Sequence, residues 1–138
     1  MRAVFVDTGY RIALINKRDS LHLKAFAVTA QLGQFAIITT DLVLVETLNY
    51  FAERGQALRE EAVYPAQQLI ADPYTELVVT GKLHLVNGLA LYRKRKDQGY
   101  SLTDCVSIGV MRDRGLSEAL AYDSHFLTEG FVPLLRQS

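Results

Sequence analysis

The sequence predicts an α/β fold, a three-layer α/β/α sandwich with a central parallel sheet of four to five strands. Short apolar stretches without polar alternation, typical of strands covered on both faces, alternate with longer stretches of helical periodicity. Because helices separate the strands, we expect right-handed crossovers, a parallel sheet and helices on both of its faces. The length of 138 residues suits one domain, which we expect to span residues 1–138.

The first half of the chain shows this alternation clearly. An apolar stretch at residues 3–6 predicts the first strand, and Gly33 ends a helix whose apolar residues recur at helical spacing. Thr39, Thr40 and Asp41 can cap the helix that follows the second strand. In chain order, we expect a strand at 3–6, helices at 8–16 and 20–32, a strand at 35–38, and helices from this cap to 54 and from 57 to 71.

In the second half, glycines end the longer stretches of helical periodicity. Gly99 ends one helix and Gly115 another, while Ser101 opens the helix between them. In chain order, we expect a strand at 76–79, helices at 83–97 and 101–114, a strand at 119–122 and a short fifth strand at 131–133.

Composition excludes several classes of protein. Lys plus Arg and Asp plus Glu both number 15, so RNA would have to be attracted by local basic patches or a bound cation. Cys105 is the one cysteine of the sequence, which excludes an internal disulfide framework and a zinc site built on cysteines. No apolar run approaches about 20 residues, and Asp7 comes too early for a signal peptide, so we expect a cytoplasmic protein with no membrane span.

Four acidic residues stand where a parallel sheet would gather them. Asp7 directly follows the first expected strand, and Asp123 follows the fourth. Glu46 lies in the helix after the second strand, and Asp104 lies in the first turn of the helix opened by Ser101. Ligands of such sheets bind beyond the carboxyl ends of the strands, at a topological switch point, so we expect all four carboxylates at one edge.

Each of these acids also has a structural interpretation. Asp7 can be a helix N-cap, Asp104 can complete a capping box with Ser101, and Asp123 can form an Asx turn. For any one of these three alone, the structural interpretation is at least as strong as a functional one. The structural interpretation fits Glu46 less well, because Glu46 is too deep in its helix to be a cap and its neighbours at helical spacing are mostly apolar.

Four carboxylates at one edge would raise one another's pKa values, and no basic cluster lies near any of them in the sequence. A hard divalent cation removes this conflict, since carboxylate oxygens and water are the ligands that Mg²⁺ or Mn²⁺ prefers. An open site of this kind suits the cleavage of phosphodiester bonds. The pattern therefore predicts a metal site for phosphoryl-ester chemistry.

Four segments, in this order, resemble the motifs of PIN domains, in particular those of the VapC-like toxins of toxin–antitoxin pairs. No single motif is specific, but together they cover essentially the whole chain, with the expected strands and helices between them. The segments are Val4-Phe5-Val6-Asp7-Thr8, Leu44-Val45-Glu46, Ser101-Leu102-Thr103-Asp104-Cys105 and Ala119-Leu120-Ala121-Tyr122-Asp123-Ser124-His125-Phe126, with Gly130-Phe131 behind the last.

The resemblance implies an Mg²⁺- or Mn²⁺-dependent endoribonuclease that leaves a 5′-phosphate and a 3′-hydroxyl. It implies that Asp7, Glu46 and Asp104 hold the metal, and that Asp123 completes the acidic pocket or a second metal position. The implied partners are an RNA substrate, an antitoxin protein and a second copy of the chain in a homodimer. Apolar residues in the helices between residues 21 and 69 fit core packing, a dimer interface or a groove for an antitoxin helix.

Three further positions belong to these motifs. The resemblance implies that Thr8 and Thr103 orient carboxylates through hydrogen bonds. The sequence departs from the family at His125, where many members carry another acid. The number of metal ions and the role of His125 stay open at this point.

Basic residues near the end of the helix expected at 83–97, together with one in the next helix, are candidates for contacts with RNA phosphates. They fit equally well a solvated helix end whose cations complement the helix dipole. The candidates are Arg93, Arg95, Lys96 and Arg112.

Competing functions lack the residues that they require. A receiver domain needs an acid after the third strand, where Val79-Thr80-Gly81-Lys82 stands, and a haloacid-dehalogenase-type phosphatase needs an Asp at Gly9. The glycine pattern of a P-loop or dinucleotide site is absent from the sequence. Two alternatives remain: a non-catalytic PIN-like module that binds protein or RNA, and a PIN nuclease of RNA processing outside toxin–antitoxin systems.

Overall fold

In the computed structural model, which describes residues 1–136, five parallel strands form one sheet in the order β3-β2-β1-β4-β5. The strands are β1 (Arg2–Val6), β2 (Phe35–Thr40), β3 (Thr75–Val78), β4 (Glu118–Leu120) and β5 (Val132–Pro133). The helices are α1 (Thr8–Ile15), α2 (His22–Leu32), α3 (Asp41–Phe51), α4 (Gln56–Glu61), α5 (Val63–Ala71), α6 (Lys82–Lys94), α7 (Leu102–Asp113) and α8 (Ser124–Thr128), with a 3₁₀ turn, η1 (Leu134–Arg136). Within residues 1–136, no helix has both the length and the apolar character to cross a bilayer.

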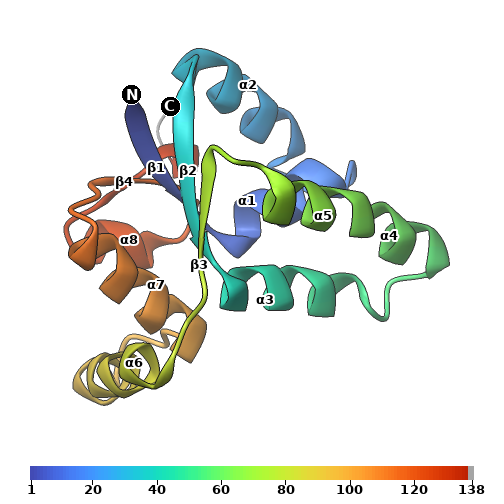
Figure 1. Cartoon of the computed structure of the whole chain (residues 1–138). Coiled ribbons are helices and arrows are strands. Elements are labelled where there is room, and N and C mark those ends of the chain that lie inside the picture. Colours follow the sequence, from blue (N-terminus) through green and yellow to red (C-terminus); the bar gives the residue numbers. More distant parts are fainter. Residues whose placement is uncertain (137–138) are drawn as a thin grey trace.

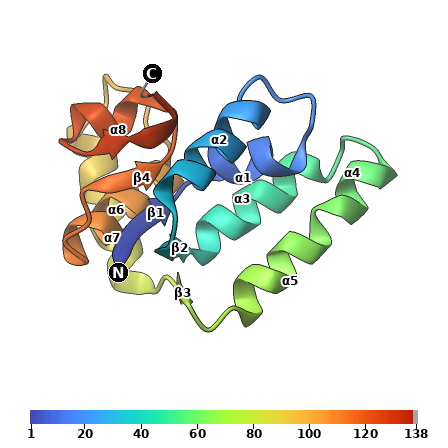
Figure 2. The same cartoon turned by 90° about the horizontal axis from the view of Figure 1, so that it is seen from above.

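Helices cover both faces of the sheet, so the predicted three-layer α/β/α sandwich is confirmed (Figure 1). Along β1, Val4 and Val6 pack in a core with α1, α2 and η1, while Phe5 packs in a core with α7 and α8. Because side chains of a strand alternate between faces, one central strand anchors both hydrophobic cores. Helix α6 packs on α7, and the α4–α5 pair extends beyond the sheet from the end of α3 (Figure 2).

The chain places β1 at the centre of the sheet and builds outward from it in two directions. Strands β2 and β3 follow on one side, and β4 and β5 lie on the other. The carboxyl ends of β1 and β4 therefore border a topological switch point, where Val6 pairs with Leu120. This register brings the residues that follow the two strands, Asp7 and Asp123, to the same edge of the sheet.

Threonine side chains hold the carboxyl end of β2 and the start of α3 in place. The Thr39 hydroxyl donates to the Val6 carbonyl over 2.7 Å, which ties β2 to β1 beside the switch point. The Thr40 hydroxyl accepts from the backbone N–H of Val43 over 3.1 Å, so the predicted cap of this helix is confirmed. Helix α3 therefore starts at the edge of the sheet where the acids are expected.

The ends of the predicted elements agree with the structure to within three residues, but one local prediction is wrong. The single helix predicted at 57–71 is two helices, α4 and α5, with a break at Ala62. Pro65 explains the break, because it has no N–H to donate to the carbonyl four residues earlier and its ring crowds that carbonyl. Asp123, for which an Asx turn is the structural alternative, is the N-cap residue of the short helix α8 and makes no capping hydrogen bond through its side chain.

The close contact between Gly88 of α6 and Val106 of α7 predicts that a methyl group added at Gly88 destabilises the protein. A Cβ at Gly88 would lie 2.8 Å from Val106 Cγ2, closer than real side chains approach. We expect Gly88→Ala to lower the free energy of unfolding by about 1–2 kcal/mol, because overpacking outweighs the better helix propensity of alanine. Denaturant unfolding followed by circular dichroism measures this change.

Gly109→Ala on α7 is the matched control, because a Cβ at Gly109 would meet nothing within 4 Å. This variant gains the same helix propensity without the clash, so we expect it to stabilise the protein by up to about 1 kcal/mol. Equal stability of the two variants would show that α6 does not pack closely on α7.

Candidate active site

The structure brings the four acidic residues together at the carboxyl edge of the sheet. Asp7 follows β1 directly, and its backbone N–H donates to the Leu120 carbonyl at the end of β4 over 3.2 Å. Helix α3 carries Glu46, the first turn of α7 carries Asp104, and Asp123 is the N-cap residue of α8. The charges of these three acids each raise the pKa of Asp7, so the four carboxylates share one electrostatic environment.

Asp7 is the buried member of this group, with only 4% of its surface exposed. Burial, followed by the charge of Asp104, raises the pKa of the Asp7 carboxyl to about 8, and Asp123 and Glu46 add to the shift. The backbone N–H of Thr8 opposes it. Asp7 occupies the N-cap position of α1 but makes no capping hydrogen bond through its side chain. Helix capping therefore does not explain why an acid stands at this position.

Asp7 and the adjacent Thr8 each have a buried polar side-chain atom without a hydrogen-bond partner. Within residues 1–136, three side-chain atoms are buried and unpaired, namely Asp7 Oδ1, Thr8 Oγ1 and Ser107 Oγ. Buried polar atoms in proteins are nearly always paired, and a missing ion or water is one of the explanations for an exception. An unpaired, buried carboxylate oxygen among other acids fits a ligand of a divalent cation.

Asp104 has a structural role and faces the site as well. Its Oδ2 accepts from the Ser101 backbone N–H over 2.9 Å, and its own N–H donates to Ser101 Oγ over 3.0 Å, so the predicted capping box is present. The same Oδ2 lies 3.4 Å from Nε2 of His125. The capping box therefore holds the carboxylate of Asp104 in a fixed position at the start of α7.

Asp123 and His125 complete the exposed side of the cluster from α8. Asp123 makes no side-chain cap, and 55% of its side chain is exposed. Its Oδ2 lies 4.0 Å from His125 Nε2. One ligand atom each from Asp104, Asp123 and His125 lie within 4.8 Å of one another, which is close enough for all three to bind one cation.

Glu46 enters the site from the middle of α3, where it is half buried. Among the hydrogen bonds and ion pairs of the described residues, none involves its carboxylate. Thr8 and Thr103 also flank the acids, but in residues 1–136 neither hydroxyl bonds a carboxylate. An oxygen of Asp7 and the carboxylate of Glu46 are therefore not engaged by other protein groups within residues 1–136.

Comparison with known proteins identifies the family of this chain. The family model of the PIN domain matches residues 4–128, a range that contains all four acids. The chain belongs to the PIN domain family.

The similarity extends to individual PIN proteins. The 23S rRNA-specific endonuclease VapC20 of Mycobacterium tuberculosis, found in two strains of that species, is 29% identical over 137 residues, which covers 94% of this chain and 95% of the relative. The crystal structure of VapC20 from the same species, described as a sarcin–ricin loop cleaving toxin, superimposes with a TM-score of 0.84 and 25% identity. That match covers 94% of this chain and 97% of the VapC20 chain.

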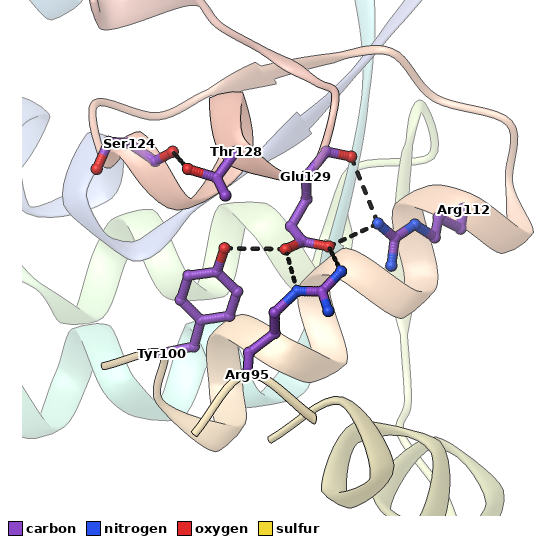
Figure 3. A network of polar contacts seen from close by, with 6 residues as sticks. All are labelled: Arg95, Tyr100, Arg112, Ser124, Thr128 and Glu129. Carbon is purple, nitrogen blue, oxygen red and sulfur yellow. Dashed lines mark hydrogen bonds and ion pairs between the residues drawn. The ribbon is translucent and has the colours of Figure 1, made fainter. Parts of the chain in front are cut away.

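The PIN domain also contains a buried acid that the sequence gives no sign of. Glu129, directly after α8, has 1% of its side chain exposed, and it accepts from Arg95 Nε over 2.8 Å and from the Tyr100 hydroxyl over 2.9 Å (Figure 3). A guanidinium nitrogen of Arg112 donates to its other oxygen over 2.8 Å. The hydrogen bond from Arg95 is the largest cause that lowers the pKa of Glu129, to about 2.

This network changes the interpretation of the basic residues. Arg95 and Arg112 pair with the buried Glu129 and so join α6, α7 and the end of α8, although 31% and 47% of their side chains stay exposed. Arg93 and Lys96 are exposed. The sequence does not show which of the four basic residues pair with an acid, because Glu129 lies 34 residues from Arg95 and 17 from Arg112 along the chain.

A hollow with a volume of about 410 Å³ lies between the end of α6 and the start of α7. Its lining combines three basic side chains with two aromatic rings, a combination that suits phosphates and stacked bases of single-stranded RNA. The hollow borders the acidic site, because the ring of Tyr100 lies 4.6 Å from the ring of His125, centroid to centroid. The lining residues are Tyr92, Arg93, Arg95, Lys96, Gly99 and Tyr100.

The raised pKa of Asp7 predicts that Asp7→Asn stabilises the metal-free PIN domain. Between the ordinary pKa of 3.8 and about 8, the unfolded chain releases the proton of Asp7 while the folded chain keeps it, so stability falls as the pH rises. Asparagine removes this dependence. We expect a gain of up to about 5 kcal/mol at pH 8 and almost none at pH 4, measured by thermal unfolding in a chelating buffer.

Asp123→Asn is the comparison for this experiment, because the exposed Asp123 contributes less to the raised pKa than burial and Asp104 do, so its removal should stabilise the protein much less. A second measurement adds Mn²⁺, which should raise the melting temperature of the unmodified protein more than that of Asp7→Asn. A loss of stability in metal-free Asp7→Asn at pH 8 would assign Asp7 to the folding of α1 instead.

The lowered pKa of Glu129 predicts a pH dependence of opposite sign for Glu129→Gln. The ion pairs of Glu129 stabilise the fold above its ordinary pKa of 4.5, and this stabilisation is lost as the pH falls toward 2. We expect Glu129→Gln to lower the free energy of unfolding by about 2 kcal/mol at pH 7, since it leaves two guanidinium groups without their partner. The difference from the unmodified protein should shrink below pH 4.5.

Glu76→Gln serves as the comparison, because Glu76 pairs with Arg114 at the surface, where both side chains are more than a third exposed. The loss there should not exceed about 0.5 kcal/mol. If the two glutamine variants lost equal stability, the network around Glu129 would be no more important than a surface ion pair.

Proposed function

We propose that this PIN domain is an endoribonuclease that depends on Mg²⁺ or Mn²⁺ and hydrolyses phosphodiester bonds at the four-carboxylate site. The buried oxygen of Asp7 is the observation that carries the proposal. It has no hydrogen-bond partner, and three further acids raise the pKa of its carboxyl group. Such an arrangement opposes folding unless the site has a positively charged ligand to bind.

Each acid has a distinct part in this proposal. Asp7, Glu46 and Asp104 hold the cation, while Asp123 completes the acidic pocket from its exposed side. A divalent cation bound by such carboxylates would lower the pKa of the water that attacks the phosphate and would stabilise negative charge on the leaving oxygen. The capping box keeps the Asp104 carboxylate from rotating, so this ligand is positioned before any ion binds.

The two threonines of the motifs would orient these acids. Thr8 Oγ1 is buried without a partner next to Asp7, so its hydroxyl is available for a carboxylate or a bound water. Thr103 lies beside Asp104 in the first turn of α7, where it is half buried. Hydrogen bonds of this kind fix the direction of a carboxylate and increase the affinity of the site for the metal.

RNA would reach the site across the basic hollow beside Tyr100. The chain has a formal net charge of zero, so phosphate attraction must come from a local group of cations. Arg93 and Lys96 are exposed at this hollow, and Tyr92 offers an aromatic ring to a base. Arg95 lines the same hollow while it holds Glu129, and Arg112 contributes charge from α7.

The biological setting that we propose follows from the relatives. The similar VapC20 is named a toxin that cleaves 23S rRNA at the sarcin–ricin loop, and the similarity covers nearly the full length of both chains. We therefore propose that this chain is the cytoplasmic toxin of a toxin–antitoxin pair, that an antitoxin protein inhibits it, and that it acts as a homodimer. A structured RNA with an exposed loop is the proposed class of substrate.

Cleavage of RNA by the purified protein tests the proposed function. With Mn²⁺ or Mg²⁺ we expect cuts in a 23S rRNA fragment that contains the sarcin–ricin loop, and no cuts with EDTA. Asp7→Asn and Asp104→Asn should each lower the rate by at least about 100-fold, since loss of even an indirect metal contact costs up to that much. Sequencing gels of 5′-labelled RNA measure the rate and the position of the cuts.

The control variant is Asp113→Asn, which removes an exposed acid at the far end of the same helix, α7, and should keep full activity. Cleavage that is equal in the unmodified protein and in Asp7→Asn would come from a contaminating nuclease. Absence of cleavage in both metals, on this RNA and on total cellular RNA, would favour a PIN-like module that only binds.

A further inference from the structure

His125 stands where it can bind a cation together with two of the acids. Its Nε2 lies 3.4 Å from Asp104 Oδ2 and 4.0 Å from Asp123 Oδ2. We infer that His125 is a metal ligand, and that Asp104, Asp123 and His125 form a cation position that favours Mn²⁺ and later transition metals over Mg²⁺. This inference rests on the proposed function, because Asp104 belongs to both sets of ligands.

The separations between the ligand atoms fit a hexacoordinate ion. Ligands at about 2.1 Å from such an ion lie about 3.0 Å apart when adjacent and about 4.2 Å apart when opposite. The two distances from His125 Nε2 fall between these limits, and all three ligand atoms lie within 4.8 Å of one another. The cluster can therefore bind an ion with side-chain adjustments of less than about 1 Å.

A separate observation is the unpaired carboxylate oxygen of Asp7. Asp7 is 4% exposed, and its Oδ1 makes no hydrogen bond although the atom is fully buried. A cation held by Asp104, Asp123 and His125 would supply positive charge to this acidic pocket, where the buried oxygen of Asp7 has no partner of its own.

The imidazole of His125 packs against the ring of Tyr100. The rings of Tyr100 and His125 lie 4.6 Å apart with a tilt of 55°. The Tyr100 hydroxyl donates to Glu129, and Glu129 is held by Arg95 and by Arg112, as Figure 3 shows. The position of the imidazole is thus fixed by contacts that do not involve a metal, which is a common requirement for a ligand.

The chemistry of the ligands sets the preferred ion. Mg²⁺ takes oxygen ligands, whereas an imidazole nitrogen suits the transition metals, whose affinity for a nitrogen and oxygen site rises from Mn²⁺ through Co²⁺. An acid at position 125 would give an all-oxygen set. The histidine at this position therefore shifts the selectivity of the site without changing its other ligands.

Electron spin echo envelope modulation of Mn²⁺ bound to the full chain tests this inference directly, since it detects a coordinated ¹⁴N nucleus. We expect an imidazole nitrogen signal in the unmodified protein and in His84→Gln, a histidine at the start of α6, outside the acidic site. The signal should vanish in His125→Asp, which should still bind Mn²⁺. Competition between Mn²⁺ and Mg²⁺ should show a preference for Mn²⁺ that falls by about tenfold or more in His125→Asp.

The outcomes separate the inference from the proposed function. If Mn²⁺ binds and RNA is cleaved, but the nitrogen signal is absent or survives in His125→Asp, the inference is overturned and the nuclease stands. If Mn²⁺ does not bind at the acids, the inference is overturned, and if Mg²⁺ does not bind there either, the proposed function is overturned with it. A nitrogen signal that depends on His125 alone establishes the ligand, whatever the activity on a chosen RNA.

Discussion

Repulsion among four carboxylates is the constraint around which this molecule is organised. The fold holds Asp7 in a position that is almost closed to water and surrounds it with Glu46, Asp104 and Asp123. In the absence of a cation, a buried carboxyl group can respond only by keeping its proton, which the pKa of about 8 expresses. The cluster therefore costs stability, and a ligand that relieves the repulsion would also stabilise the fold.

The topology of the sheet imposes this convergence. With β1 at the centre and the chain turning from β3 back to β4, the ends of β1 and β4 are neighbours at the switch point. A cap at Thr40 starts α3 at the same edge, and a capping box starts α7 there. Residues that stabilise strand and helix ends thus also bring acids from distant parts of the chain to one place.

The sequence was sufficient for the fold and for the positions of the acids because both depend on local patterns. Strand and helix periods predict the layers, and Asp7 stands directly behind an apolar strand whatever its neighbours are. The break at Ala62 was predictable in principle from Pro65, whose missing N–H is a local signal. The ion pairs of Glu129 and the contact between Tyr100 and His125 were not, because they depend on the packing of α6, α7 and α8 against one another.

The two buried acids of this protein show how the chain distributes its positive charge. Glu129 receives Arg95 and Arg112, and its pKa falls to about 2, while Asp7 receives no basic side chain within residues 1–136 and its pKa rises to about 8. Tyr100 lies between the two, bonded to Glu129 and in contact with His125. If arginines also reached the four acids, they would satisfy them permanently and leave no lone pairs for a metal ion. Arg95 and Arg112 pair with Glu129, and within residues 1–136 no arginine or lysine pairs with the four acids, which leaves carboxylate oxygens available to a divalent cation.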